Sequence, residues 1–260
     1  MLRNVKEMFG YHLQATDGRI GGCKDFLFDE EYWSVRYMVA DTGSWLAGKQ
    51  VLIAPELFGD PKWSSQTFPV LLSKDEIEGA PLLDSHAPVS RKHEKELRRH
   101  FGLTQYWMTG VGVGMVSGNI LPPSGLATED GERSEGDTAT EDTVGEKGDE
   151  AERLRSMGEV TGYQIVARGD EFGQVADFII DDTHWIIRYL VVHTGGWFSH
   201  RDFLVSPEWI AHISWQDKHV ALNIVKSSVE DCPVYDPSQP VNREYEEVLY
   251  DYHGKPHYWR

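Results

Sequence analysis

The sequence predicts a mainly β protein made of two tandem copies of one small module, joined by an acidic linker. Three observations support this prediction. The sequence repeats itself at a constant spacing of 152 residues, short strand-like runs recur inside each repeat, and the intervening segment has the composition of a disordered chain. We expect a first module at residues 1–107, a flexible acidic linker at 108–159 and a second module at 160–260.

The repeat becomes visible when Gly10 is placed on Gly162. GYHLQATDGRIGGCKDFLFDEEYWSVRYMVADTGSWLAGKQVLIAPE then lies over GYQIVARGDEFGQVADFIIDDTHWIIRYLVVHTGGWFSHRDFLVSPE without a gap. Chance similarity would not keep one offset over this length, so we interpret the pattern as a tandem duplication. Loops are the usual place for insertions, and loops of equal length therefore suggest that the turns pack or face a partner copy.

Within each copy the pattern favours short β-strands. Residues 25–28 and 34–40 are β-branched and aromatic runs on either side of the turn DEEYW, which predicts a β-hairpin, and DFII, DDTHW and IIRYLVV repeat it. Val35, Tyr37 and Val39 alternate with other residues, so one strand face is expected to be apolar. Further strands at QVLIAP and TFPVLLS, with their counterparts, indicate a small antiparallel barrel or sandwich.

Each copy is expected to close with a C-terminal helix. Ser90 and Asn242 are suitable N-caps, and Gly102 and Gly254 stand where a helix commonly ends. The first helix, RKHEKELRRH, is basic and polar. The second is predicted to bury one apolar stripe at helical spacing, formed by Val241, Tyr245, Val248, Leu249 and Tyr252.

Charge and composition exclude several classes of partner. Residues 129–153 hold eleven acidic and three basic side chains, which predicts a flexible tether, although one or two helical turns are expected over 149–157. The net charge of −17 argues against nucleic acid and anionic membrane surfaces. Because no run approaches the roughly 20 apolar residues that span a bilayer, we expect a cytoplasmic protein without direct membrane insertion.

The motifs of both copies resemble the PRC-barrel domain family. The resemblance is carried by a Gly-x-I/F-Gly turn before an Asp-Phe strand, by the segment D-[DE]-x-x-W-x-[VI]-R-Y, and by a T-G-x-W loop before a V-L-I-x-P strand. This family includes the cytoplasmic domain of the photosynthetic reaction centre H subunit and the C-terminal half of the ribosome maturation factor RimM. The resemblance implies that each module is a small β-barrel used for docking and assembly, and it transfers no functional residue to this chain.

Three functions are compatible with these patterns. The first is a non-enzymatic interaction protein in which two barrels pair with each other, or with barrels of another chain, and bind a protein partner without a cofactor. The second is an accessory of a membrane photosynthetic or electron-transfer complex, as the resemblance to the H subunit suggests. The third is a metal-dependent or small-molecule hydrolase, which the sequence disfavours because it has no G-x-S-x-G elbow, phosphate loop or dinucleotide fingerprint.

Individual residues that could carry chemistry have structural interpretations. The two cysteines, Cys23 and Cys232, occupy different positions in the repeat and are expected to be separate buried thiols. His193, His200 and Asp202 lie within one loop of the second copy, where a metal site is conceivable and a solvated loop is favoured. No metal site is predicted.

The acidic pairs and the strand arginines are also assigned structural roles. The acids that open each hairpin, beginning at Asp29 and Asp181, are predicted to be turn formers. Arg36 and Arg188 are expected to form ion pairs, with Asp25 or Asp177 as the suggested partner. Trp45 and Trp197 differ from the other aromatic residues because they lie in glycine-flanked loops. Each is either an interface anchor or a plug of a barrel mouth, and they are our candidate binding residues.

Overall fold

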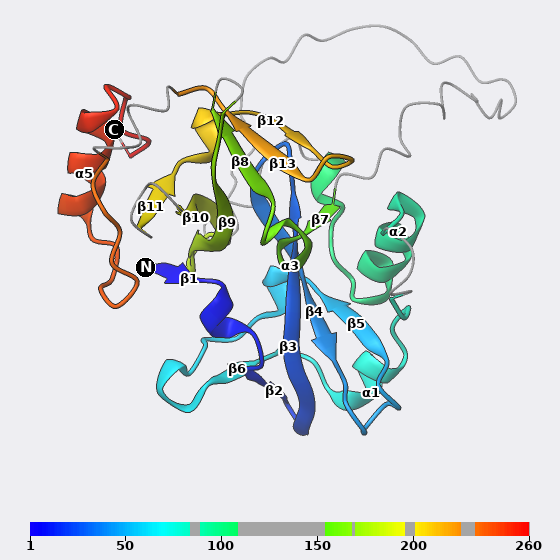
Figure 1. The fold of residues 1–260 in the computed structure, drawn as a ribbon. Coiled ribbons are helices and arrows are strands. Elements are labelled where there is room, and N and C mark those ends of the chain that lie inside the picture. The colour runs from blue at the N-terminus through cyan, green and yellow to red at the C-terminus, as the bar shows by residue number, and fades with distance from the viewer. Residues whose placement is uncertain (84–88, 109–153, 168–169, 196–200, 225–231, 260) are drawn as a thin grey trace, which may run out of the picture.

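A computed structural model describes residues 1–83, 89–108, 154–167, 170–195, 201–224 and 232–259, and every structural statement below concerns these residues. Most of the predicted linker lies outside them. We call residues 1–108 the N-terminal half and residues 154–259 the C-terminal half. In Figure 1 the two halves lie against each other, with α2 and α5 on opposite sides of the molecule.

The elements of the N-terminal half are mainly short strands. The strands are β1 (Leu2–Asn4), β2 (His12–Ala15), β3 (Gly18–Asp29), β4 (Ser34–Asp41), β5 (Gln50–Ile53) and β6 (Thr67–Pro69). The helices are α1 (Lys74–Glu78) and α2 (Arg91–His100), with 3-10 turns η1 (Lys6–Met8), η2 (Pro55–Leu57), η3 (Trp63–Ser65) and η4 (Tyr106–Met108).

The C-terminal half has a similar order of strands. Its strands are β7 (Leu154–Ser156), β8 (Gln164–Ala167), β9 (Asp170–Asp181), β10 (Ile186–His193), β11 (Asp202–Val205), β12 (Ile210–Ser214) and β13 (His219–Leu222). Its helices are α3 (Met157–Val160) and α5 (Arg243–Tyr252), with the 3-10 turn η6 (Pro207–Trp209). The strands β1 to β5 and the helix α2 each have a counterpart that begins 152 residues later.

The strands of both halves form one curved sheet, which is mainly antiparallel. The sheet has 13 strands in the order β12-β13-β8-β9-β10-β4-β3-β2-β6, with β1, β5, β7 and β11 paired beside this path. The halves meet at its centre, where Ile186 of β10 lies opposite Ser34 of β4. The predicted antiparallel pairing holds except at two places, where β2 pairs with β6 and β8 pairs with β13 in parallel. Two parallel strands need a long connection between them, and the chain from β2 to β6 provides one through β3, β4 and β5.

The hairpins β3–β4 and β9–β10 follow from their turn residues, as predicted. The Asp29 carboxylate accepts hydrogen bonds from the backbone N–H groups of Glu31 and Tyr32, at 2.9 and 3.3 Å. Asp181 accepts one from the N–H of Thr183 at 3.0 Å. These acids therefore form the turns.

Close backbone approach explains a glycine near the start of each long strand, β3 and β9. Gly21 has φ +130°, and a Cβ placed on it would lie 1.9 Å from the backbone oxygen of Asp41. Its counterpart Gly173 would place a Cβ 2.5 Å from the backbone oxygen of His193. Only glycine allows each long strand to bend this tightly onto its neighbour.

One packing prediction is confirmed and one needs correction. In β4 the face with Val35, Tyr37 and Val39 is buried, as predicted, and the alternate residues from Ser34 to Ala40 are buried too, because the strand lies at the junction of the halves. In α5 the inward residues are Glu246, Leu249 and Tyr250, while Val248 is 53% exposed. The predicted stripe is confirmed at Leu249, and Val241 and Tyr245 are partly buried against the core. It was wrong at Val248 and at Tyr252, which is also exposed, because the buried carboxylate of Glu246 sets which side of the helix faces inward.

The end of the predicted linker is folded. Residues 154–156, which lie within the span where helical turns were expected, form strand β7, and α3 follows directly.

Helix α2 begins at its N-cap Ser90, which accepts a hydrogen bond from the His93 N–H at 3.2 Å. Helix α5 begins at Asn242, which accepts one from the Tyr245 N–H at 2.9 Å. Within the described residues no helix is long and apolar enough to cross a membrane.

Candidate functional site

The candidate functional site is the junction between the halves, where each half donates its first strand to the other. Strand β1 pairs with β9 of the C-terminal half, with Leu2 opposite Asp181. Strand β7 pairs with β3 of the N-terminal half, with Leu154 opposite Asp29. The backbone N–H of Val5 continues the first ladder by donating to the oxygen of Phe178 at 2.9 Å. The junction is therefore a reciprocal strand exchange.

One carboxylate in each half, buried for Asp177 and partly buried for Asp25, holds the strand that comes from the other half. Asp177 accepts hydrogen bonds from the backbone N–H of Lys6 at 2.9 Å and from the side chain of Asn4 at 3.1 Å. Asp25 makes the equivalent contacts, with the N–H of Gly158 at 3.0 Å and with the hydroxyl of Ser156. Burial raises the pKa of both carboxyls, although these hydrogen bonds oppose the rise.

An arginine from each exchanged strand connects the two halves at the surface. Arg3 lies over the Trp63 ring, at 4.1 Å from its centroid, and its Nε lies 3.1 Å from Asp182 of the C-terminal half. Arg155 repeats the arrangement, over the Trp215 ring at 4.0 Å and 3.2 Å from Glu30. Each guanidinium thus stacks on an aromatic ring of its own half while it pairs with an acid of the other.

The two hairpin turns cross at the junction and carry a tryptophan each. The N–H of Val35 donates to the oxygen of Trp185, and the N–H of Ile187 donates to the oxygen of Trp33, both at 2.8 Å. Trp33 and Trp185 have φ values of 53° and 56°, which bulky residues rarely adopt. Packing across the junction must hold the turns in this conformation.

The ring of Trp185 enters the core of the N-terminal half. It is 7% exposed, and its centroid lies 4.8 Å from Phe58, 5.7 Å from Phe68 and 5.9 Å from Phe26. Three aromatic residues of one half therefore surround a side chain of the other. The junction therefore has an apolar aromatic contact in addition to its hydrogen bonds and ion pairs.

A second buried cluster attaches α2 to the sheet. The Glu94 carboxylate accepts hydrogen bonds from the hydroxyls of Tyr37 at 3.1 Å and Tyr106 at 2.7 Å, and it pairs with Arg91 at 2.9 Å. Burial raises the pKa of Glu94. The Arg98 guanidinium, which is also buried, pairs with Glu56 at 2.6 Å. These hydrogen bonds and ion pairs engage Glu94 and Arg98, which would otherwise be candidates for acid–base chemistry.

The C-terminal half holds α5 in the same way. Glu246 accepts hydrogen bonds from the hydroxyls of Tyr189 at 2.7 Å and Tyr258 at 2.8 Å, and it pairs with Arg243 at 3.0 Å. Burial, with the hydrogen bond to Glu246, raises the pKa of Tyr258 to about 12. The place of Arg98 is taken by Tyr250, whose hydroxyl donates to Ser206 at 3.2 Å.

The strand arginines form ion pairs, as predicted, but with other partners than those suggested. Arg36 pairs with Asp29 at 3.2 Å and both side chains are almost fully buried. Arg188 pairs with Asp181 at 3.6 Å and is partly exposed. Asp25 was the wrong partner because the register of the hairpin places it opposite Val39, away from Arg36. Its carboxylate instead binds the exchanged strand.

A cleft of about 350 Å³ opens where the halves meet. The N-terminal half contributes Glu31, Tyr32 and Trp33 to its lining, and the C-terminal half contributes residues that include Arg188 and Tyr258. The cleft therefore exists only while the two halves are joined. Its walls are aromatic with a few charged groups, which is the composition of many ligand and peptide sites.

The candidate tryptophans, the loop histidines and the cysteines form none of the junction contacts described above. Trp45 is half-buried and packs against the core, with the Lys74 ammonium 5.7 Å from its ring centroid. Trp197 lies outside the described residues, so the suggested anchor role of this pair stays a prediction. His193 binds Asp202 at 2.6 Å, whereas His200 lies outside the described residues. Cys23 and Cys232 are separate buried thiols, as predicted.

The sequence contained a signal for the junction that its interpretation did not use. Asp25 and Trp33 are identical to their counterparts Asp177 and Trp185 in the second segment. We interpreted these residues as parts of a turn or an ion pair within one module and did not consider a contact between the two modules.

In the described part of the chain, no group of three or more histidine, cysteine or carboxylate side chains could hold a metal ion.

Comparison with known proteins identifies one domain. The model of the PRC-barrel domain family matches residues 156–229, which begin at the end of β7 and include β8 to β13. The C-terminal half therefore contains a PRC-barrel domain, a fold that often occurs in protein-interaction modules. The chain matches no curated protein.

Proposed function

We propose that this chain is a non-enzymatic protein-interaction and assembly protein built from two PRC-barrel copies that pair with each other. The observation that carries the proposal is the reciprocal strand exchange, in which β1 and β7 each complete the sheet of the other half. The carboxylate and arginine contacts that support the exchange also occur twice, at positions 152 residues apart. Such a two-fold arrangement is typical of a symmetric dimer interface, here contained in one chain.

Paired copies are suited to docking because the exchange joins them into one body with two outward faces. The carboxylates and arginines that could carry out catalysis are engaged instead in holding strands and helices, as with Asp177 and Glu94. The proposed partners are proteins, since the net charge of −17 repels nucleic acid. The absence of a cofactor and of catalysis, and the cytoplasmic location, are part of this proposal.

Cutting the chain between the halves tests the pairing. A protease recognition site placed within residues 130–140 allows the full-length protein to be cleaved after it has folded. We expect the two pieces to elute together at the mass of the intact chain, measured by size-exclusion chromatography with light scattering. A denaturing gel confirms the cut.

Separation of the cut protein into two monomeric pieces would contradict the proposal. A variant that combines the cut with Asp177→Ala and Trp185→Ala serves as the control, because it removes contacts of the junction and should release the pieces. A matched cut variant with Trp45→Ala changes a tryptophan outside the junction, and its pieces should stay together.

A further inference from the structure

The outward side of α2 is basic in an otherwise acidic protein. Lys92, Lys95, Glu96 and Arg99 follow one another at helical spacing and are all exposed. We call them the α2 outer face. The two ion pairs that α2 forms, described above, engage its buried side and leave these three cations in solvent.

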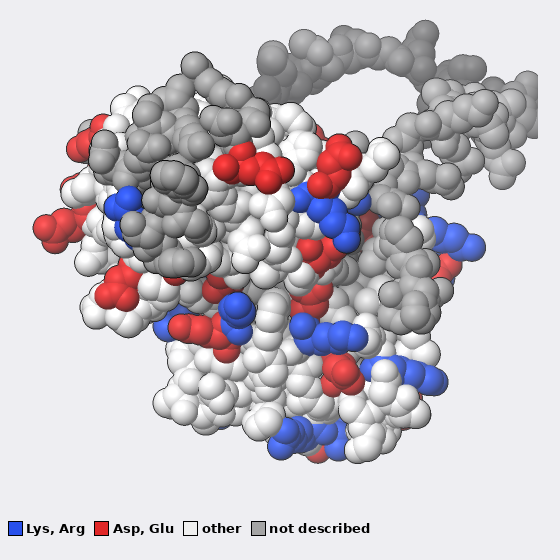
Figure 2. Space-filling view, viewed as in Figure 1, with Lys and Arg blue, Asp and Glu red and all other residues white. Residues whose placement is uncertain are grey.

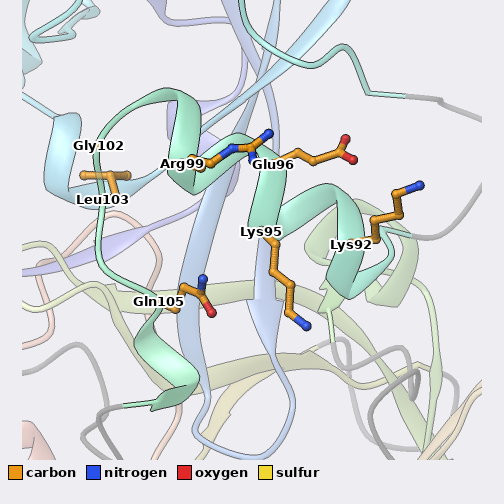
Figure 3. A pocket seen from close by; sticks show the side chains of 7 residues that line it. All are labelled: Lys92, Lys95, Glu96, Arg99, Gly102, Leu103 and Gln105. Atoms are coloured by element: carbon orange, nitrogen blue, oxygen red, sulfur yellow. The ribbon is translucent and has the colours of Figure 1, made fainter. Parts of the chain in front are cut away.

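A groove runs along this face. It has a volume of about 590 Å³ and is lined by the α2 outer face together with Gly102, Leu103 and Gln105. Figure 3 shows the side chains of the helix on one side and those of the following segment on the other. The groove thus combines a basic edge with apolar surface from Leu103 and from the aliphatic parts of the lysines.

The outward side of α5 has the opposite charge at the same positions. The residues 152 positions later are Glu244, Glu247, Val248 and Asp251, which we call the α5 outer face. All four are exposed, and Val248 is an exposed apolar side chain among the three acids. Asp251 pairs with a neighbouring histidine and is still 74% exposed.

The two outer faces cannot meet within one molecule. In Figure 1, α2 and α5 lie on opposite sides of the body, and Figure 2 shows basic side chains along the edge at α2 and acidic ones along the edge at α5. A contact between them therefore requires two molecules. Because the faces differ, the contact is head-to-tail, and repetition gives rings or open chains.

We propose that a second copy of this chain docks through its α5 outer face into the groove of the α2 outer face. This proposal rests on the proposed assembly function and names the partner. Three cations meet three anions, and Val248 lies against the apolar surface beside Leu103. Opposite charges at matching positions fix the orientation and favour this contact over an α2–α2 or α5–α5 contact, in which like charges would repel.

Charge reversal of either face tests the proposal on the full-length chain. The α2 variant is K92E/K95E/R99E and the α5 variant is E244K/E247K/D251K, and all six positions are exposed, so folding is retained and is checked by circular dichroism. Masses are measured by sedimentation over a range of protein concentration, in low salt and in high salt, because screening weakens exposed charge pairs.

We expect the wild-type mass to rise with concentration in low salt and to fall in high salt. Each variant alone should associate at least about tenfold more weakly, since three attractive pairs become repulsive. An equimolar mixture of the two variants should associate again, and so should one chain that carries all six changes. Both variants keep a net negative charge, so general attraction cannot account for that recovery.

The control is K24E/K49E/K62E, which changes the net charge as much as the α2 variant does but outside α2, and it should associate like wild type. The proposal is overturned if the wild-type chain stays at single-chain mass in low salt, or if the α2 variant associates as well as the control. Either outcome would leave the pairing of the halves intact, because the cut-chain experiment measures that pairing separately.

Discussion

Replacing Trp185 by alanine tests whether the junction stabilises the whole molecule. The Trp185 ring belongs to the C-terminal half but lies among Phe26, Phe58 and Phe68 of the N-terminal half, with 7% of the residue exposed. A buried tryptophan removes about 150–250 Å² from water. At about 25 cal/mol per Å² this burial is worth about 4–6 kcal/mol, as an upper estimate.

Truncation of such a residue to alanine typically costs about 3–5 kcal/mol, in agreement with that area. With a urea dependence of about 2–3 kcal/mol per M, the unfolding midpoint should fall by about 1–2.5 M. The measurement is urea unfolding, followed by the fluorescence of the other tryptophans and by circular dichroism. Both signals should shift together, because the ring connects the cores of the two halves.

Trp33→Ala is the matched control for this prediction. Trp33 has the same backbone conformation, with φ 53°, and stacks on Phe28 at 5.4 Å, but it is only partly buried. Its replacement should cost about 1–2 kcal/mol. An effect of Trp185→Ala no larger than that of Trp33→Ala would refute the argument that Trp185 anchors one half in the other.

Three further predictions concern buried acids and backbone contacts. Burial raises the pKa of Asp25 and Asp177, so their contribution to stability is fully present below about pH 3.9 and is lost as the pH rises through their folded values. The stability of wild type relative to Asp25→Asn/Asp177→Asn, measured by urea unfolding, should therefore fall as the pH rises above about 4, and a pH-independent difference would contradict this. Glu94→Ala should cost about 3–5 kcal/mol in thermal or urea unfolding because it leaves Arg91 without its buried partner, whereas replacement of the exposed Glu96 should cost less than about 0.5 kcal/mol. Gly21→Ala should lower the unfolding midpoint far more than Gly43→Ala, since a Cβ on Gly21 would lie 1.9 Å from a backbone oxygen while that on Gly43 has nothing within 4 Å, and equal effects would exclude the steric explanation.

The parts of the fold that depend only on residues close together in the sequence could be predicted from it. The turn-forming role of Asp29 needs only the N–H groups two and three residues ahead, and the capping role of Ser90 needs only the first turn of its helix. Local hydrogen bonds of this kind are encoded within a few residues. The hairpins and the starts of both helices could therefore be located by residue type.

The exchange of strands could not be predicted in this way. Strand β1 is the three-residue segment LRN, which is too short to show a period of two, and its partner lies far along the chain. The prediction of which side of α5 faces inward failed for a related reason. A scale of hydrophobicity places glutamate outside, whereas Glu246 is buried because two tyrosine hydroxyls and an arginine satisfy its oxygens.

Matching positions of the two halves have the same role at the junction but opposite charges on the outer sides of α2 and α5. This difference connects the proposed pairing of the halves with the proposed self-association. At the junction the matching positions Asp25 and Asp177 have the same role, because each must hold a strand of the other half. On the outer sides of the helices Lys95 and Glu247 have opposite charges. In a dimer of two identical chains every outer face would occur twice with the same charge. Joining both halves in one chain removes this restriction, so one end can become basic and the other acidic, which a directional head-to-tail contact requires.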